Sequence, residues 1–125
     1  MSFYRNEIAR LNKALYPHDN LTRQIRQSKS YIGKNFSENI NLDKIAAQAL
    51  VSKFHFIRLF KKYYGRTPNQ YLQEVRIEKT KKLLSKGNSI DDVCIAIGFA
   101  SKTSFITLFR KMTGITPLIY QKKRK

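Results

Sequence analysis

The sequence predicts an all-α protein that contains a duplicated helical unit. Apolar residues recur at helical spacing along the chain, and the alternation typical of strands is absent. One segment also occurs twice, because residues 59–71 return as residues 108–120. The same register pairs Ser52 with Ser101. Two copies of one small unit therefore account for much of the chain.

The composition restricts the possible functions. The chain has 125 residues and a formal net charge of +17. This length fits one domain or two small ones and leaves no room for a separate catalytic domain. The first 20 residues carry three basic and two acidic side chains, so the positive charge belongs to the rest of the chain. Such a field predicts a polyanionic partner, and nucleic acid belongs to that class.

Residues 1–20 are expected to form a short leader helix and a linker. The apolar residues between Phe3 and Leu15 follow a helical stripe, and Pro17 is expected to end that helix. Residues 18–20 are then expected to be a joint.

A first subdomain is predicted over residues 21–68, starting with a helix over residues 21–36. Asn41 is expected to cap a helix over residues 42–49, and Ser52 a helix that starts at Lys53, because both side chains can accept a backbone N–H bond. Glycine adopts the left-handed conformation without strain, so Gly65 is expected to end the last helix after Tyr64. The residues expected to face inward are Ile25, either Tyr31 or Ile32, Phe36, Phe56, Leu59, Phe60 and Tyr63.

A long linker helix is expected over residues 69–86, followed by a second subdomain over residues 87–125 with a basic tail. Thr67-Pro68 can start the linker helix, since proline is tolerated at the first helical position. In the second subdomain Ser89 and Ser101 are expected to cap helices ending near residues 97 and 112, and Thr116-Pro117 to start a last short helix. The inward residues are expected to be Phe105, Leu108, Phe109 and Met112.

Each subdomain has the order short helix, turn, capped helix, which is the order of a helix-turn-helix motif. In that motif the first helix braces the second, and the second lies in a major groove of DNA. The linker helix spans roughly 27 Å at 1.5 Å per residue. Two reading helices at its ends can therefore meet successive major grooves, about 34 Å apart.

The outward faces of the two capped helices are expected to contact bases. Arg58 can make a bidentate contact to guanine, and Phe54 and Ile57 can pack on thymine methyl groups. Apolar residues at helical spacing also suit a core, so Phe54 and Ile57 keep that alternative. We expect weaker base discrimination from the second helix, whose outward side chains are short. They are Thr103, Ile106 and Thr107.

A second set of residues is expected to contact DNA phosphates. It combines hydroxyl groups at the starts of the capped helices with the lysines and arginines along them. Any of these charged side chains can instead be merely solvated. The set is Ser52, Lys53, Lys61, Lys62, Ser101, Ser104, Arg110 and Lys111.

Residues 42–120 resemble the DNA-binding domain of the AraC/XylS family of bacterial transcription regulators. The match is strongest over Ile97-Gly98-Phe99-Ala100-Ser101, then Phe105, Phe109-Arg110-Lys111, Gly114 and Thr116-Pro117. The resemblance implies a monomer that binds adjacent major grooves of double-stranded DNA through two helix-turn-helix units and recruits RNA polymerase. The resemblance also adds Lys102 to the expected base contacts. Separately, we expect an activator that needs no cofactor.

The chain departs from the family pattern at three places. Leu50 stands where the first turn usually carries glycine, so that turn is expected to be tightened differently. Gln121 replaces the closing arginine and puts a structural ion pair there in doubt. Ile106 and Thr107 replace the polar or cationic residues common in the second reading helix.

The sequence offers little for other kinds of chemistry. No apolar run approaches the ~18 residues of a membrane span, so a cytoplasmic, nucleoid-associated protein is expected. Cys94 is the only cysteine and is expected to pack, while His18 and His55 lack partners at metal-ligand spacing. We therefore expect neither an enzyme nor a metal protein.

Two other classes stay open. One is a protein that binds structured RNA or coats nucleic acid without sequence preference. The other is a protein-interaction module in which the leader helix docks a partner. The operator, the target genes, activation against repression, and whether this is an entire protein are also open.

Overall fold

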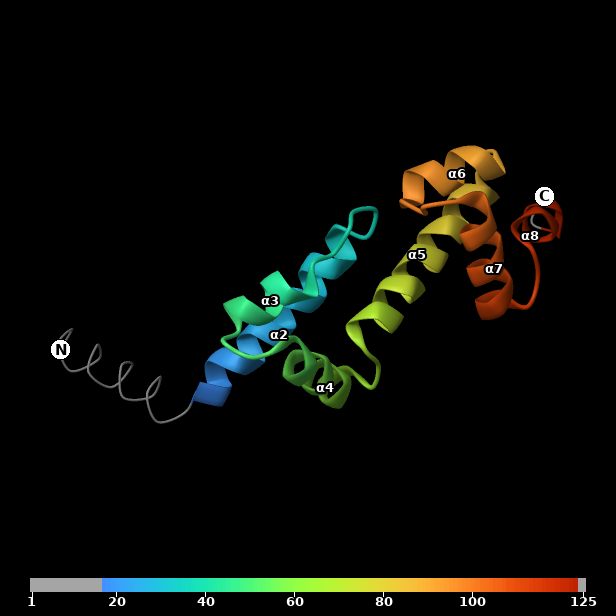
Figure 1. The fold of residues 1–125 in the computed structure, drawn as a ribbon. Coiled ribbons are helices and arrows are strands. Elements are labelled where there is room, and N and C mark those ends of the chain that lie inside the picture. Colours follow the sequence, from blue (N-terminus) through green and yellow to red (C-terminus); the bar gives the residue numbers. More distant parts are fainter. Residues whose placement is uncertain (1–16, 124–125) are drawn as a thin grey trace, which may run out of the picture. The chain divides into compact units, whose positions relative to one another are not determined.

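The computed structural model describes residues 17–123. Within these residues the chain forms seven α-helices and no strand, which confirms the all-α prediction (Figure 1). The leader helix expected before Pro17 lies outside the described residues. The helices are α2 (Pro17–Lys34), α3 (Leu42–Gln48), α4 (Lys53–Tyr64), α5 (Pro68–Ser85), α6 (Ile90–Ile97), α7 (Lys102–Thr113) and α8 (Pro117–Lys123).

The helix α2 starts earlier than expected. Residues 18–20 were expected to be a joint, and this was wrong because they belong to the first turn of α2. Pro17 opens that turn, where the missing proline N–H has no helical partner to lose. The helix also ends at Lys34, two residues before the expected end at Phe36.

The described residues pack into two units. The first combines residues up to Ile32 with Asn41–Pro68, and the second combines Gly33–Ile40 with the chain from Asn69 onward. The connection between α2 and α3 therefore packs with the second unit, although both neighbouring stretches of chain belong to the first.

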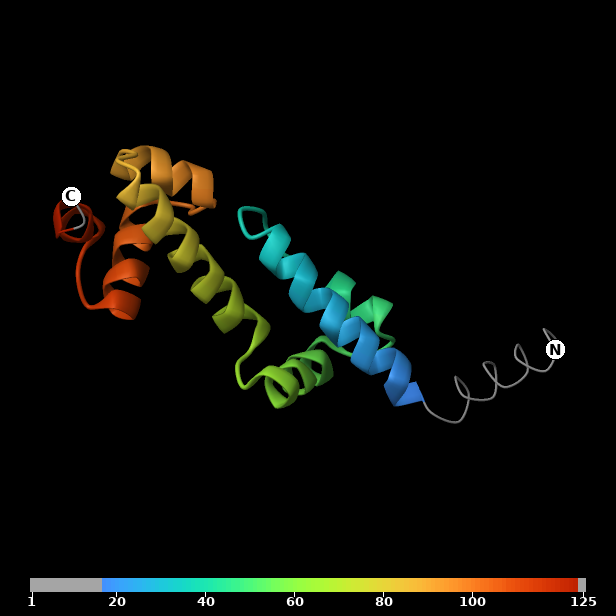
Figure 2. The same cartoon turned by 180° about the vertical axis from the view of Figure 1, so that it is seen from behind.

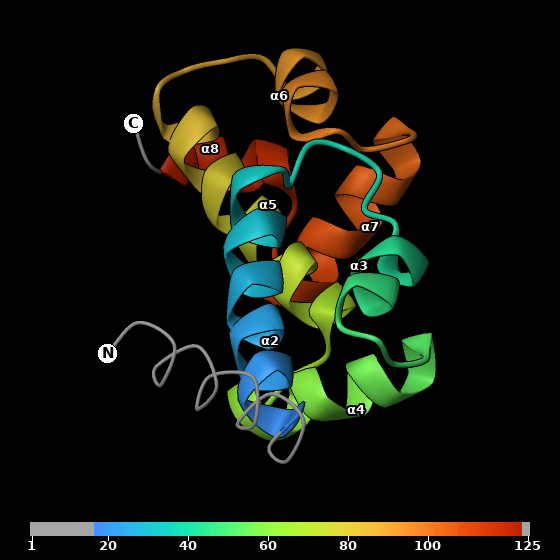
Figure 3. The same ribbon diagram turned by 90° about the vertical axis from the view of Figure 1, so that its left-hand side faces the viewer.

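The first unit is a small bundle of α2, α3 and α4. Its buried residues come from all three helices and the turn after α3, and α4 passes close to α2 (Figures 2 and 3). At one contact between these two helices, the hydroxyl groups of Thr22 and Tyr63 share a hydrogen bond of 2.9 Å. At another, the Lys29 ammonium lies 4.5 Å from the centroid of the Tyr64 ring. The buried apolar side chains are Ile25, Ile32, Ala46, Ala49, Phe56 and Phe60.

The second unit gathers α6, α7 and α8 around α5 (Figure 1). Phe36, from the segment between α2 and α3, is partly buried against the same core. Gln121 of α8 donates hydrogen bonds from its amide to the carbonyl oxygens of Leu84 and Asn88, so α8 is tied to the end of α5 without the family's arginine. The core residues are Ile77, Leu84, Val93, Cys94, Ile97, Phe105 and Phe109.

Two inward predictions were wrong. Tyr63 was expected to be buried and is 51% exposed, and Met112, also expected inside, is 39% exposed. Both residues stand in the last turn of a 12-residue helix, at the edge of the core. The earlier phenylalanines of each stripe, such as Phe56 and Phe105, are fully buried as expected.

The predicted caps are confirmed. Asn41 and Ser89 accept backbone N–H bonds from Lys44 and Asp92, at 3.2 and 3.1 Å. The same kind of bond caps α4 and α7. Ser52 accepts from the His55 amide at 3.1 Å, and Ser101 accepts from the Ser104 amide at 3.0 Å. Glycines in the left-handed conformation follow α4, α6 and α7.

The turns between bracing and capped helices differ in one respect. In the second unit Gly98 takes the left-handed conformation, with φ of 92°, directly after α6. In the first unit the left-handed residue comes one position later and is Leu50, with φ of 60°. The N–H of Val51 then reaches the Ala46 carbonyl, as the N–H of Phe99 reaches Cys94. The first turn is therefore tightened differently, as expected from the missing glycine.

Candidate nucleic-acid interface

The exposed face of α4 carries most of the predicted contacts of the first unit. Phe54 is 68% exposed and Arg58 is also exposed, so neither side chain belongs to the core. Ile57 between them is half-buried. Lys53 is half-buried too, with its ammonium 5.4 Å from the centroid of the Phe54 ring. The side chains of Lys61 and Lys62 are exposed on the later turns.

The corresponding face of α7 is more polar. Thr103 and Thr107 are exposed, and Ile106 between them is half-buried in the same way as Ile57. Arg110 and Lys111 are exposed near the end of the helix. Between Lys53 and Tyr64, and between Lys102 and Thr113, there is no acidic residue, so the charged side chains of both helices are all basic.

A hydrogen bond within the chain limits what the Ser101 hydroxyl can donate. The Ser101 hydroxyl accepts the Ser104 amide and donates its own proton to the Ser104 hydroxyl, at 2.9 Å. A phosphate contact from Ser101 would therefore break a bond inside the protein, whereas the Ser104 hydroxyl keeps its own proton for donation. Ser52 likewise accepts the His55 amide as a cap.

Lys102 makes an ion pair that the sequence analysis missed. Its ammonium lies 3.0 Å from a carboxylate oxygen of Asp91, on the first turn of α6. The register assigns Lys53 to the position of Lys102 and Leu42 to the position of Asp91, so the first repeat has no acidic residue where Asp91 stands in the second. The signal that could have found it is this difference between two otherwise matching copies.

The comparisons with known proteins place this architecture in a family. Residues 45–123 match the family model described as a helix-turn-helix domain. A transcriptional regulator from Chromobacterium violaceum, described as containing an AraC-type DNA-binding domain, superposes with a TM-score of 0.71 at 31% sequence identity. That match covers 82% of this chain and 93% of the other. The chain belongs to the AraC-type family of DNA-binding domains.

Two further relatives of this AraC-type domain bear on function. The bifunctional transcriptional activator and DNA repair enzyme AdaA of Bacillus subtilis is 42% identical over 96 residues, which cover 76% of this chain and 46% of AdaA. The DNA-binding domain of AdpA, solved with a target DNA, has a TM-score of 0.72 and 26% identity over 79% of this chain and 90% of its own. The chain spans about half the length of the first two curated relatives that it matches.

A metal-binding cluster and the Cys94 thiol are two other candidate sites to consider among the described residues of the AraC-type domain. Among the described residues no cluster of histidine, cysteine and acidic side chains could hold a metal ion. Cys94 is buried in the core of the second unit, and this burial, with a smaller effect of Asp91, raises the pKa of its thiol. The sulfur therefore packs as expected.

None of the described helices alone is long and apolar enough to cross a membrane. Taken together, α6 and α7 reach that length and composition only as a pair bent by 90°. The buried side chains of both helices form part of the core of the second unit.

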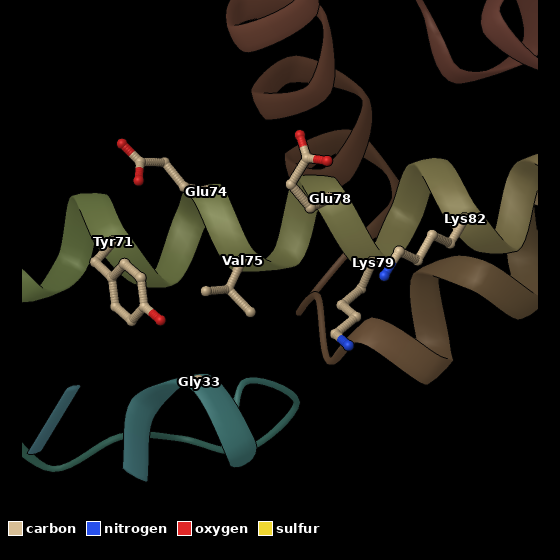
Figure 4. A pocket seen from close by; sticks show the side chains of 7 residues that line it. All are labelled: Gly33, Tyr71, Glu74, Val75, Glu78, Lys79 and Lys82. Carbon is tan, nitrogen blue, oxygen red and sulfur yellow. The ribbon is translucent and has the colours of Figure 1, made fainter. Parts of the chain in front are cut away.

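An open groove of about 380 Å³ lies between α5 and the end of α2 in the second unit. Figure 4 shows Tyr71, Val75 and Lys79 pointing toward the segment that carries Gly33, and Glu74 and Glu78 on the other side of α5. A Cβ at Gly33 would lie 3.2 Å from the Tyr71 hydroxyl, so glycine at residue 33 permits its close approach to Tyr71. The groove is thus a packing feature beside the 33–40 segment, and it contains none of the predicted DNA contacts.

Proposed function

We propose that this AraC-type domain binds double-stranded DNA at specific sequences by inserting α4 and α7 into adjacent major grooves. The observation that carries the proposal is the repetition itself. Two capped 12-residue helices occur in one register, each with an exposed face that is basic and free of acidic residues. A face of this kind suits a polyanion, and a helix of this length fits a major groove.

The two helices divide the work. On α4, Arg58 reads guanine while Phe54 and Ile57 contact thymine methyl groups. The helix α7 presents shorter side chains and discriminates less between bases. Its proposed base contacts are Lys102, Thr103, Ile106 and Thr107.

Phosphate contacts fix the register of both helices on the duplex. The exposed lysines and arginines on the later turns of α4 and α7 supply most of them, together with the groups at the helix starts. Because Ser101 donates inside the protein, Ser104 is the better hydroxyl donor of that pair. The proposed set is Ser52, Lys53, Lys61, Lys62, Ser101, Ser104, Arg110 and Lys111.

The finer features of the function are part of the same proposal. The domain acts as a monomer on DNA in the bacterial cytoplasm and activates transcription by contacting RNA polymerase. The description of AdaA as a transcriptional activator supports activation. We propose no catalytic role for these residues, since AdaA, whose description includes repair, is more than twice the length of the matched part.

Selection of binding sites from a random duplex pool tests the proposal. The purified protein should enrich a site with two half-sites about one helical turn apart, and bind it at least 10³-fold more tightly than random DNA at physiological salt. Equal binding to selected and random duplexes would support the alternative of a protein that coats nucleic acid without sequence preference. Tighter binding to structured RNA at the same salt would support the RNA-binding alternative and overturn the proposal of sequence-specific DNA binding.

A further inference from the structure

The segment between α2 and α3 is an integral part of the second unit. Residues 33–40 group with α5 to α8, and Phe36 packs against that core. The Lys79 ammonium also lies 5.9 Å from the centroid of the Phe36 ring. The Phe36 side chain thus holds the segment to the second unit, and the backbone of the segment is also held, by hydrogen bonds.

Arg76 of α5 forms two hydrogen bonds with the backbone of this segment. Its Nε donates to the carbonyl oxygen of Phe36 at 2.7 Å, and its Nη2 donates to that of Glu38 at 3.3 Å. Burial lowers the pKa of the Arg76 guanidinium, which nevertheless stays protonated at neutral pH. A charged fork with two carbonyl acceptors makes stronger bonds than neutral donors do. Arg76 therefore fixes the residue between them, Ser37.

Ser37 in turn lies against the turn that leads into α7. Its backbone is so close to Gly98 that a Cβ there would stand 2.8 Å from the Ser37 carbonyl carbon and 2.9 Å from its Cα. Contacts this short are not tolerated, so only glycine fits. The backbone of residue 37 thus covers the turn between the bracing helix α6 and the reading helix α7.

Phe99 completes the path to the reading helix. Its ring lies 5.7 Å from the guanidinium carbon of Arg76 on one side and stacks at 4.9 Å on the ring of Phe105. Phe105 is fully buried and belongs to the first turn of α7 that faces the core. A contiguous set of contacts therefore runs from Arg76 through residues 36–38 and the Gly98–Phe99 turn to α7.

Among the described residues, the first unit has no counterpart to this arrangement. In the repeat register Leu50 takes the place of Phe99, and its side chain is 84% exposed. The Leu50 side chain before α4 is thus exposed, whereas the matching Phe99 side chain before α7 packs against Arg76 and Phe105.

We propose that Arg76 is a positioning residue that uses the 36–38 backbone to hold the α6–α7 turn and so fixes α7 for DNA reading. This inference rests on the proposed function of α7 and adds a residue that does not itself touch DNA. Short side chains such as Thr103 and Thr107 tolerate little error in distance, so a rigidly held helix is needed for them to discriminate bases.

Arg76→Ala in the full chain tests the proposal without DNA first. Hydrogen exchange of the Gly98 and Phe99 amides, bonded to Ile95 and Cys94, should accelerate roughly tenfold or more. The Leu50 and Val51 amides of the first turn are the internal control and should not change. Unchanged exchange at residues 98–99, or equal acceleration throughout α5 to α8, would overturn the proposal.

The DNA arm uses the selected site and two derivatives, each with one half-site scrambled. Arg76→Ala should reduce the preference for the intact second half-site, on the order of tenfold, and leave the preference for the first half-site intact. A full preference for both half-sites, despite accelerated exchange, would overturn the positioning role. If the unaltered protein prefers no half-site, the proposed function fails. The hydrogen-exchange measurement still tests whether Arg76 holds the α6–α7 turn.

Two variants separate positioning from charge. Arg76→Lys keeps the charge but cannot bridge both carbonyl groups, so it should behave like Arg76→Ala in both measurements. Lys82→Ala removes an exposed charge from the same helix and should leave exchange at residues 98–99 unchanged. Full rescue by lysine would mean that Arg76 acts only through its charge.

Discussion

The ammonium nitrogen of Lys102 lies 3.0 Å from a carboxylate oxygen of Asp91, across the turn that joins α6 to α7. Both side chains are more than half exposed, so the pair adds little to the stability of the fold, within about 1 kcal/mol. Its larger effect should fall on DNA binding. The base contact proposed for Lys102 first requires this ion pair to break.

Asp91→Asn should therefore release Lys102 and strengthen DNA binding by a few-fold. The plot of log K against log salt should become steeper by about 0.9, because the released ammonium adds one positive charge at the DNA and displaces about one more counterion. Equilibrium titrations between low and physiological salt measure both quantities. Asp92→Asn removes a neighbouring exposed carboxylate and is the control. Identical salt slopes for the two variants would show that the ion pair is irrelevant.

Arg58 and Lys61 occupy the same exposed face of α4 and should respond differently to truncation. Arg58→Ala should cost about 1–3 kcal/mol on the preferred site and relax selection at one base pair. Lys61→Ala should weaken binding to all sequences alike and reduce the salt slope by about one. Competition titrations with single-base variants of the site distinguish the two results. A uniform loss from both variants would contradict the proposed division between base and phosphate contacts.

The parts of the molecule that were predicted correctly are those that neighbouring residues determine. A serine before an apolar stripe caps a helix wherever that helix packs, so Ser52, Ser89 and Ser101 could be assigned from spacing alone. Phe56 and Phe105 are buried for a similar reason, because helical periodicity places them opposite the polar face.

The rest depends on contacts between residues far apart in the sequence. Arg76 and Phe36 are 40 residues apart, and no local pattern distinguishes this arginine from the other basic residues of α5. The exposure of Tyr63 likewise follows from its place in the last turn of α4, at the edge of the core. The base and phosphate contacts stay predictions, since exposure shows only that DNA can reach these side chains.

The left-handed conformation of Leu50 predicts a stabilising substitution. This conformation costs a residue with a Cβ about 1–2 kcal/mol. Glycine avoids that cost but loses about 0.5–1 kcal/mol of stability, because it makes the unfolded chain more flexible. Leu50→Gly should therefore raise the free energy of unfolding by roughly 0.5–1 kcal/mol, since the exposed leucine loses little burial.

Urea denaturation of the matched set tests this value. Leu50→Ala keeps the Cβ and should gain nothing, which separates backbone strain from the loss of an exposed apolar side chain. Gly98→Ala should destabilise by clearly more than 1 kcal/mol, because it adds strain at a positive φ and overlap with Ser37. A stabilising effect of Leu50→Ala equal to that of glycine would show that strain is not the cause.

Thr80 on α5 predicts a second stabilising substitution. Its side chain is fully buried, and its hydroxyl oxygen has no hydrogen-bond partner among the described residues. A buried polar group without a partner costs about 1–3 kcal/mol. Valine has nearly the same shape without that group, so Thr80→Val should raise the free energy of unfolding by about 1 kcal/mol. Thr80→Ala also removes the hydroxyl but leaves a cavity, and it should gain less or lose stability. Destabilisation by Thr80→Val in urea denaturation would contradict this prediction.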